Sequence, residues 1–209
     1  MTRVPAAPSD SLAGLPPDIA PKSAVVATLG PAGTDAQAEA SRFFEKVVLA
    51  ESFGGAMRFG QTENSYVLVA AGFLERKGGD VTDSWVDMHF RTFGRMRLVA
   101  AWENNTKVMC VATNPATAST PEEARTLAIH PATAAFANRF APLASHLYVN
   151  AKPTAVQWAS DGRADGCVGS LDVVRQAPGL VVHHIFRPTM LWCLYEPTRR
   201  TRTGERGAA

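Results

Sequence analysis

The sequence predicts an α/β protein built of two lobes that flank a cleft. Apolar β-type runs alternate with helical patterns along most of the 209 residues. The strand–turn–helix pattern of the first half recurs in the second half, and two β-rich runs lie between the halves. In folds of this kind the ligand cleft lies at the carboxyl ends of strands, beside helix N-termini. The two strand–helix junctions that open the halves are therefore the first places to expect a functional site.

The elements of the first half follow from apolar patterns and from the residues that start and stop helices. A helix is expected after Thr62, and the pair Gly78-Gly79 provides the signal that ends it. The turn-forming tetrad at 103–106 joins two β-rich runs and predicts a hairpin. The expected elements are a strand at 24–29, a helix at 35–44, a strand at 47–51, a helix at 63–76, and strands at 97–102 and 107–113.

The second half repeats this alternation. Pro131 follows His130 at the start of a helical stretch, a position where proline is favoured. Asp161-Gly162 is a turn signal that separates the next helix from the strand after it. The expected elements are strands at 126–129, 146–150, 165–169, 181–186 and 190–195, and helices at 132–140, 153–160 and 170–176.

The most informative motif is the turn LGPAGT at 29–34, between the first strand and the first helix. Gly30 and Gly33 allow backbone conformations closed to other residues, and Thr34 or Asp35 can cap the helix. The N–H groups of the first helical turn then form a site suited to a carboxylate or phosphate. The junction at 130–133 offers a second site of this kind, so a ligand with two anionic groups is expected.

The composition excludes several classes of protein. The formal net charge is +2, and no basic patch interleaved with aromatic residues indicates a nucleic-acid partner. No apolar stretch is long enough to cross a membrane, and the N-terminus has no signal-peptide core, so a cytoplasmic location is expected. Residues 1–22 are expected to be a disordered extension and residues 198–209 a basic disordered tail. Cys110, Cys167 and Cys193 lie in apolar runs without metal-site spacing, which is typical of buried free thiols.

Three segments, in order and at matching spacing, resemble the prephenate dehydratase family. They are LGPAGT at 29–34, AIHPAT at 128–133 and AVQWASDGRADGCVGS at 155–170. The resemblance implies a catalytic domain at 23–197 made of two Rossmann-like α/β lobes, similar to type II periplasmic binding proteins. Lobe one would cover about 23–113 plus the C-terminal strand, and lobe two about 114–187. It also implies a homodimer that needs no cofactor and no metal.

The C-terminal segment PTMLWCLYEP at 188–197 resembles the shorter branch that contains the prephenate decarboxylases of bacilysin-type and salinosporamide-type pathways. The dehydratases carry Thr-Arg-Phe at this place, whereas here Thr189 is followed by Met190 and Leu191. The resemblance therefore implies decarboxylation of prephenate, or of a related cyclohexadienyl dicarboxylate, without formation of an aromatic ring. A retained acid at Thr189 would favour dehydration instead.

The candidate site residues come from these segments and from two others. His89 and Arg91 are expected on one side of an extended segment, where Arg91 could bind a carboxylate. Each candidate has a plainer alternative: Thr34 as a simple helix cap, Lys152 as a solvated charge, Trp192 as core. Candidate catalytic residues are His130, Thr189 and His89; candidate substrate-binding residues are Gly33, Thr34, Arg91, Pro131, Lys152 and Trp192.

Three functions remain open at this point. The first is a small lyase that acts on prephenate, by decarboxylation or by dehydration to an aromatic keto acid. The second is a carboxylate-binding module without catalysis, because two α/β lobes around a cleft are also the plan of solute-binding domains. The third is a dimeric assembly partner with a degenerate site.

Overall fold

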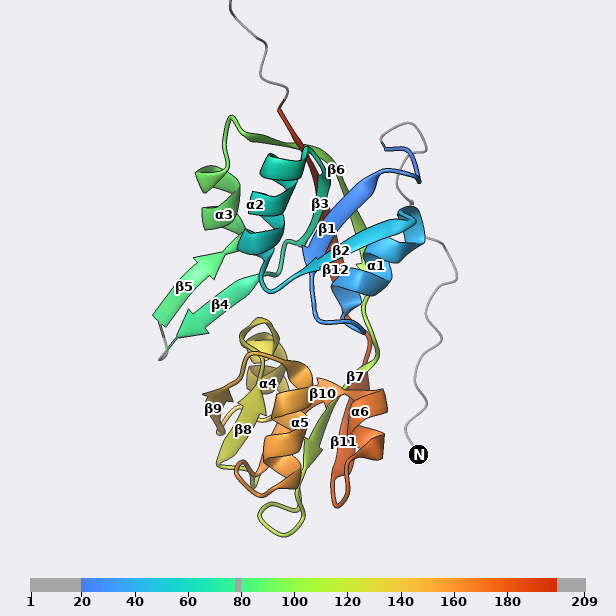
Figure 1. Ribbon diagram of the computed structural model, residues 1–209. Coiled ribbons are helices and arrows are strands. Elements are labelled where there is room, and N and C mark those ends of the chain that lie inside the picture. Colours follow the sequence, from blue (N-terminus) through green and yellow to red (C-terminus); the bar gives the residue numbers. More distant parts are fainter. Residues whose placement is uncertain (1–19, 78–79, 199–209) are drawn as a thin grey trace, which may run out of the picture. The chain divides into compact units, whose positions relative to one another are not determined.

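Two α/β units make up the described part of the chain, residues 20–77 and 80–198 of a computed structural model (Figure 1). Unit 1 contains residues 70–87 and 102–191, and unit 2 contains residues 20–69, 88–101 and 192–198. Each unit has its own five-stranded sheet. The predicted α/β class is confirmed. The predicted disordered extension and basic tail lie, except for residues 20–22 and 198, outside the described residues.

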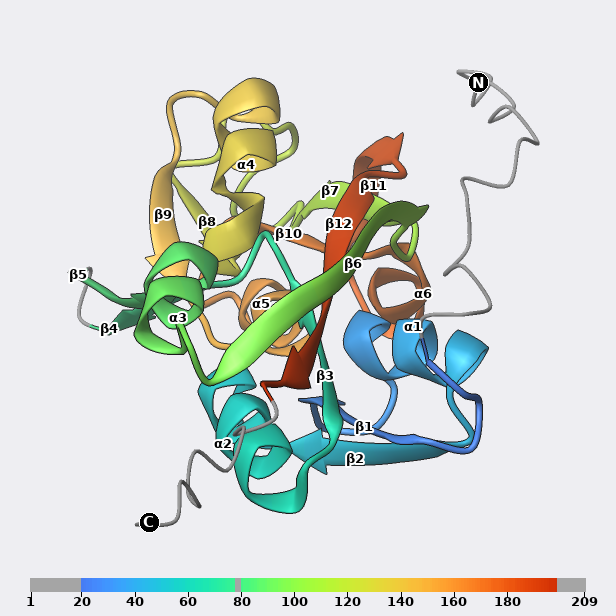
Figure 2. The same ribbon diagram turned by 90° about the horizontal axis from the view of Figure 1, so that it is seen from above.

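The sheet of unit 2 has the strand order β2-β1-β3-β12-β6, with β1 parallel to β2 and β3. Helices α1 and α2 both pack against β1 and β2, and Figures 1 and 2 show them on opposite faces of the sheet. The elements are β1 Val25–Leu29, α1 Asp35–Phe43, β2 Lys46–Ala50, α2 Phe53–Glu63, β3 Tyr66–Ala70, α3 Trp85–Arg91, β6 Met96–Asn105 and β12 Thr189–Pro197.

The sheet of unit 1 has the order β11-β7-β10-β8-β9, in which β8 is parallel to β9 and β10, and β7 is antiparallel to β10. A separate antiparallel ribbon is formed by β4 and β5. The elements are β4 Leu74–Lys77, β5 Asp80–Ser84, β7 Met109–Thr113, β8 Thr126–Ile129, η1 Pro131–Thr133, α4 Ala134–Phe140, β9 Ser145–Tyr148, α5 Lys152–Ser160, β10 Gly166–Ser170, α6 Leu171–Gln176 and β11 Val181–Phe186.

Helices cover both faces of this sheet, so its central strands β7, β8 and β10 are apolar on both sides. Cys110, Ala128 and Cys167 pack with side chains of α5 and α6 on one face. Leu127 and Val168 pack with side chains of α4 on the other face. Burial on both faces explains why these strands read as continuous apolar runs instead of alternating ones.

The helix predicted at 63–76 is wrong. Helix α2 ends at Glu63, and Asn64 caps it with a left-handed backbone, φ 51°. The following run YVLVA is β3, where Val67, Leu68 and Val69 are fully buried. In a short run of apolar residues, the spacing cannot distinguish a strand that is buried on both faces from a helix. For this reason the pattern predicted a helix where the structure has a strand.

The hairpin predicted across 103–106 is also wrong. Strand β6 continues through this tetrad to Asn105 and belongs to the sheet of unit 2, whereas β7 lies in the sheet of unit 1. Strand β7 and the ribbon β4–β5 both belong to unit 1. Most of the remaining predicted elements agree with the observed ones within a few residues, including β1, α1, β8, α5, β11 and β12.

Candidate functional sites at the sheet edges

The glycine turn of unit 2 leads directly into α1, as the motif predicts. Gly33 has φ 87°, a left-handed conformation that favours glycine. Thr34 is the N-cap of α1: its hydroxyl accepts a hydrogen bond from the Gln37 N–H at 3.2 Å and donates one to the Leu29 carbonyl at 3.0 Å. The capping role of Thr34 is therefore confirmed.

The same contacts change the anion-site hypothesis for this turn. The Gly33 N–H donates to the Gln37 side-chain oxygen at 2.6 Å, and the Gln37 N–H donates to Thr34. Two of the donors that an anion would use are thus engaged by the chain itself. An anion at this turn would have to displace the Gln37 side chain from Gly33, which lowers its affinity by the free energy of that hydrogen bond.

Trp192 lies at this same edge of the sheet. Leu191 accepts a hydrogen bond from the Ala71 N–H at 2.8 Å, which places the start of β12 beside the carboxyl end of β3. Trp192 is 3% exposed, and its indole N–H finds no acceptor within the described residues 20–77 and 80–198. A buried donor of this kind is uncommon, and a ligand with an acceptor oxygen would satisfy it.

His89 and Arg91 do not lie on one side of an extended segment, because they are part of helix α3. Two residues along a helix are separated by about 200° of rotation, so their side chains point in different directions. His89 is tied to the interior of unit 2: its Nδ1 lies 2.9 Å from the hydroxyl of Tyr195, which is 1% exposed. Arg91 is exposed. The predicted pairing of an imidazole with a guanidinium is therefore wrong.

The second junction, in unit 1, follows β8. His130 caps the short helix η1, and its Nδ1 accepts a hydrogen bond from the Ala132 N–H at 3.2 Å. Pro131 is buried at the first position of this helix. The Thr133 hydroxyl donates to the His130 carbonyl at 2.7 Å. Because Nδ1 is an acceptor, the proton of neutral His130 resides on Nε2.

Burial, and secondly the positive charge of Lys152, lower the pKa of His130 to about 4. The imidazole is therefore neutral at pH 7 and offers an Nε2–H hydrogen-bond donor instead of a ready acidic proton. Lys152 begins α5, just after β9. Since β8 and β9 are parallel neighbours, the residues after their carboxyl ends meet at one edge of the sheet.

Two residues that the sequence did not single out join this edge. Tyr148 ends β9 and is 37% exposed, and the Arg76 guanidinium carbon lies 5.2 Å from the centre of its ring. Arg76 is on β4, which packs against η1. Unit 1 thus collects two basic side chains, Arg76 and Lys152, with the neutral His130. We refer to Arg76, His130, Tyr148 and Lys152 as the basic corner.

Thr189, at the start of β12, is exposed, and its hydroxyl donates a hydrogen bond to the Glu103 carboxylate. The proton that a catalytic threonine would give to a leaving group is therefore engaged by a carboxylate. The sequence predicted Thr189 as a candidate acid, but Glu103 was not foreseen because it was assigned to a turn.

The cysteines behave as the sequence predicts, since all three are buried and form no disulfide. Burial raises the pKa of Cys110 to about 11 and that of Cys167 to about 12, which leaves both as unreactive thiols.

Among the residues that the structure describes, no three His, Cys, Asp or Glu side chains gather in a way that could hold a metal ion. No helix in this part of the chain is long and apolar enough to span a membrane.

No protein-family model matches the sequence, and no curated protein matches it. Solved structures share its fold. The prephenate dehydratase from Arthrobacter aurescens, solved in complex with L-Phe, aligns with a TM-score of 0.54 and 12% identity over 83% of this chain and 60% of that protein. The prephenate dehydratase from Staphylococcus aureus aligns with a TM-score of 0.51 and 8% identity over 84% of this chain and 68% of that protein.

A domain that is not described as an enzyme has the same fold. The periplasmic VFT2 domain of BvgS from Bordetella pertussis aligns with a TM-score of 0.50 and 12% identity, over 84% of this chain and 81% of that domain. At these identities the similarity establishes the fold, which is the type II periplasmic-binding-protein-like fold also found in prephenate dehydratase. The present chain spans about 60% of the length of the A. aurescens enzyme.

Proposed function

We propose that this protein is a cofactor-independent lyase that decarboxylates prephenate, or a closely related cyclohexadienyl dicarboxylate, without forming an aromatic ring. The observation that carries the proposal is the basic corner of unit 1, whose His130 belongs to the segment at 128–133 that resembles prephenate dehydratase, in a fold shared with that enzyme. Two positive side chains beside a neutral histidine suit a carboxylate with an adjacent oxygen.

In the proposed reaction the bond between the ring and its carboxylate breaks and CO2 leaves. The electron pair passes into the ring, and a ring carbon takes up a proton from water while the hydroxyl group stays. Dehydration differs in one step, because the electron pair stays in the ring, which becomes aromatic, while hydroxide leaves with the electrons of its own C–O bond. That step is helped by an acid at the hydroxyl group. The engagement of the Thr189 proton by Glu103 supports the first outcome.

We assign separate roles to the residues of the basic corner. Arg76 and Lys152 bind a substrate carboxylate, Arg76 as a planar guanidinium held on the Tyr148 ring. His130 donates its Nε2–H to a neighbouring oxygen of the substrate. In unit 2, Thr34, Gly33 and Trp192 remain predicted substrate contacts, and the Trp192 indole N–H is a buried donor that an acceptor on the substrate would satisfy.

Incubation of the purified protein with prephenate tests the proposal. Release of CO2 with a product that keeps its vinylic proton signals in NMR is the expected result. Phenylpyruvate, recognised by its ultraviolet absorbance in alkali, would instead identify a dehydratase. Absence of both products would overturn the lyase proposal for this substrate.

Arg76→Gln gives a residue-level test with a matched control. Arg163 also lies over an aromatic ring, with its guanidinium carbon 4.1 Å from the centre of the Trp158 ring, but at the carboxyl-terminal side of α5. We expect Arg76→Gln to raise KM by about tenfold or more, because a charge-assisted hydrogen bond to the substrate is lost. Arg163→Gln should leave KM unchanged. Equal effects of the two variants would contradict the role of Arg76.

The second candidate function is a carboxylate-binding module, which the similarity to the BvgS VFT2 domain supports. Saturable binding of prephenate in calorimetry, without any product after long incubation, would favour it.

We also propose that the protein is a cytoplasmic homodimer. Light scattering on the purified protein tests the dimer, and a mass equal to that of one chain would contradict it.

A further inference from the structure

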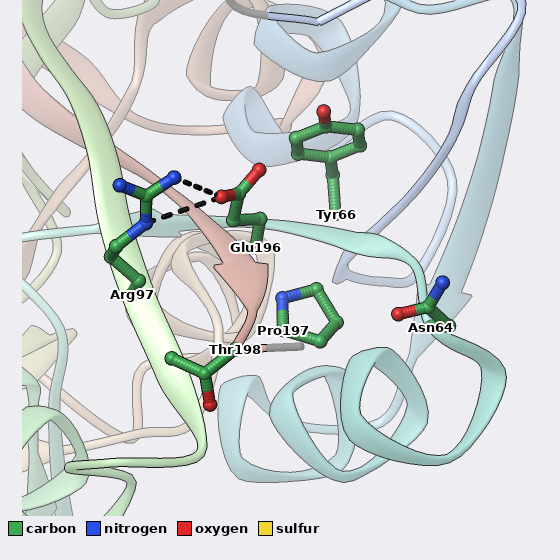
Figure 3. A pocket seen from close by; sticks show the side chains of 6 residues that line it. All are labelled: Asn64, Tyr66, Arg97, Glu196, Pro197 and Thr198. Atoms are coloured by element: carbon green, nitrogen blue, oxygen red, sulfur yellow. Dashed lines mark hydrogen bonds and ion pairs between the residues drawn. The ribbon is translucent and has the colours of Figure 1, made fainter. Parts of the chain in front are cut away.

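Unit 2 contains a hollow of about 610 Å³ at the sheet edge opposite to the glycine turn. It lies where β3 begins, β12 ends and β6 begins, close to the C-terminal end of α2 (Figure 3). Pockets of this size hold small molecules in other proteins. The lining residues are Asn64, Tyr66, Arg97, Glu196, Pro197 and Thr198.

The lining carries one charge of each sign. Arg97 donates from its Nε to the Glu196 Oε1 at 3.2 Å and from one of its terminal nitrogens to the same oxygen, as Figure 3 shows. Within residues 20–77 and 80–198, the second oxygen of Glu196 and the other terminal nitrogen of Arg97 have no hydrogen-bond partner. The pair therefore presents one open acceptor and one open donor side by side.

This arrangement selects among ligands by charge. The Glu196 carboxylate would repel an anion such as a dicarboxylate, and the Arg97 guanidinium would repel a simple cation. For either ligand this repulsion offsets the attraction to the oppositely charged side chain. A ligand that carries both charges on neighbouring atoms can place its carboxylate on Arg97 and its ammonium on Glu196. The α-amino acid head group has this geometry.

The uncharged residues that line the hollow indicate what kind of side chain the ligand carries. The Tyr66 ring, which packs against the Phe44 ring at 5.9 Å between centres, and the Pro197 ring form an apolar side. The Asn64 amide adds a polar side. We propose that this hollow is a binding site for a free α-amino acid with an apolar side chain, distinct from the basic corner. The proposal does not depend on the proposed function.

Calorimetry with the full-length protein tests the proposal, with L-leucine and L-tryptophan as probes of two side-chain sizes. Both should bind saturably at millimolar concentrations or below. N-acetyl-L-leucine lacks the ammonium group and L-leucinamide lacks the carboxylate, so each should bind about tenfold more weakly or not at all. Absence of saturable binding of both amino acids, or equal binding of the blocked derivatives, would overturn the proposal.

Variants locate the site. Arg97→Gln and Glu196→Gln should each weaken amino-acid binding by about tenfold or more, whereas the exposed charges Arg58 and Glu45, changed to Gln, should have no effect. Thermal unfolding of each variant checks the fold, because loss of a largely exposed ion pair changes stability little. Turnover of prephenate by Arg97→Gln and Glu196→Gln should equal that of the unchanged protein. Binding that survives both substitutions would exclude this hollow.

Discussion

Replacement of His130 by Asn should remove a pH-dependent loss of stability. The Asn side chain can still accept a hydrogen bond from the Ala132 N–H, so the cap of η1 is kept while the titrating group is lost. Burial and the charge of Lys152 lower the pKa of His130 from 6.5 to about 4. His130 therefore binds a proton more weakly in the folded protein than in the unfolded chain.

The sign and the size of the effect follow from proton linkage. Above pH 6.5 neither state binds the proton, so His130 contributes no pH dependence. As the pH falls from 6.5 towards 4, the unfolded chain takes up the proton first and the folded state loses stability. At about 1.4 kcal/mol for each tenfold difference in proton affinity, the loss is about 2 kcal/mol between pH 7 and pH 5 and about 3 kcal/mol by pH 4.

Urea unfolding at pH 7, 6 and 5, followed by circular dichroism, measures this difference. The free energy of unfolding of the unchanged protein should fall by about 2 kcal/mol more than that of His130→Asn over this range. The pKa values of His146 and His183 are also lowered by burial, but both residues are present in both proteins, so their effects cancel. If the free energy of unfolding changed with pH equally in the two proteins, the reasoning would be refuted, because His130 would then have the same pKa in the folded and unfolded states.

Four further predictions concern three substitutions and the reactivity of the cysteines. Thr34→Ala should lower the free energy of unfolding by about 1 kcal/mol in urea unfolding, because α1 loses its cap, whereas Thr34→Ser should not. Gly166→Ala should lower it by about 1–3 kcal/mol in the same assay, because the added methyl would lie 2.5 Å from the Ala112 carbonyl oxygen. A thiol reagent at pH 8 should label no cysteine in the folded protein and all of them in urea. If the protein turns over prephenate, Glu103→Gln should raise the share of phenylpyruvate among the products, measured by absorbance in alkali, because the Thr189 proton is then held less strongly.

Sequence patterns predicted those elements whose ends carry their own chemical signals. Strand β1 and helix α1 were predicted to within one residue because Gly33 and Thr34 mark the turn and the cap, and these roles depend only on nearby backbone. Strand β8 was predicted without error, because His130-Pro131 ends it. In these places local propensity and tertiary structure agree, which is what makes a pattern reliable.

The patterns failed where tertiary contacts decide the outcome. Residues 66–70 are a strand because they pair between β1 and β12, and nothing local distinguishes that run from a helix. This error hid Arg76, which was placed in a helix and belongs to β4. Tyr148 was likewise missed, because its place next to Arg76 depends on two segments more than seventy residues apart. The basic corner was thus half visible in the sequence, through His130 and Lys152.

The protonation state of His130 also bears on which product the proposed lyase forms. A substrate carboxylate next to Lys152 would offset the positive charge that lowers the pKa of His130, but it would not offset burial, which is the larger cause. The pKa would therefore stay below 6.5, and at neutral pH the imidazole would still hold its Nε2 proton as a weak hydrogen-bond donor. Expulsion of hydroxide is helped by a stronger acid than this, and the Thr189 hydroxyl is already donating to Glu103. Cleavage of the bond to CO2 needs no acid at the hydroxyl group, and a water molecule can supply the proton that the ring carbon takes up. The chemistry of these side chains therefore favours decarboxylation with the hydroxyl retained, and His130 acts by orienting the substrate.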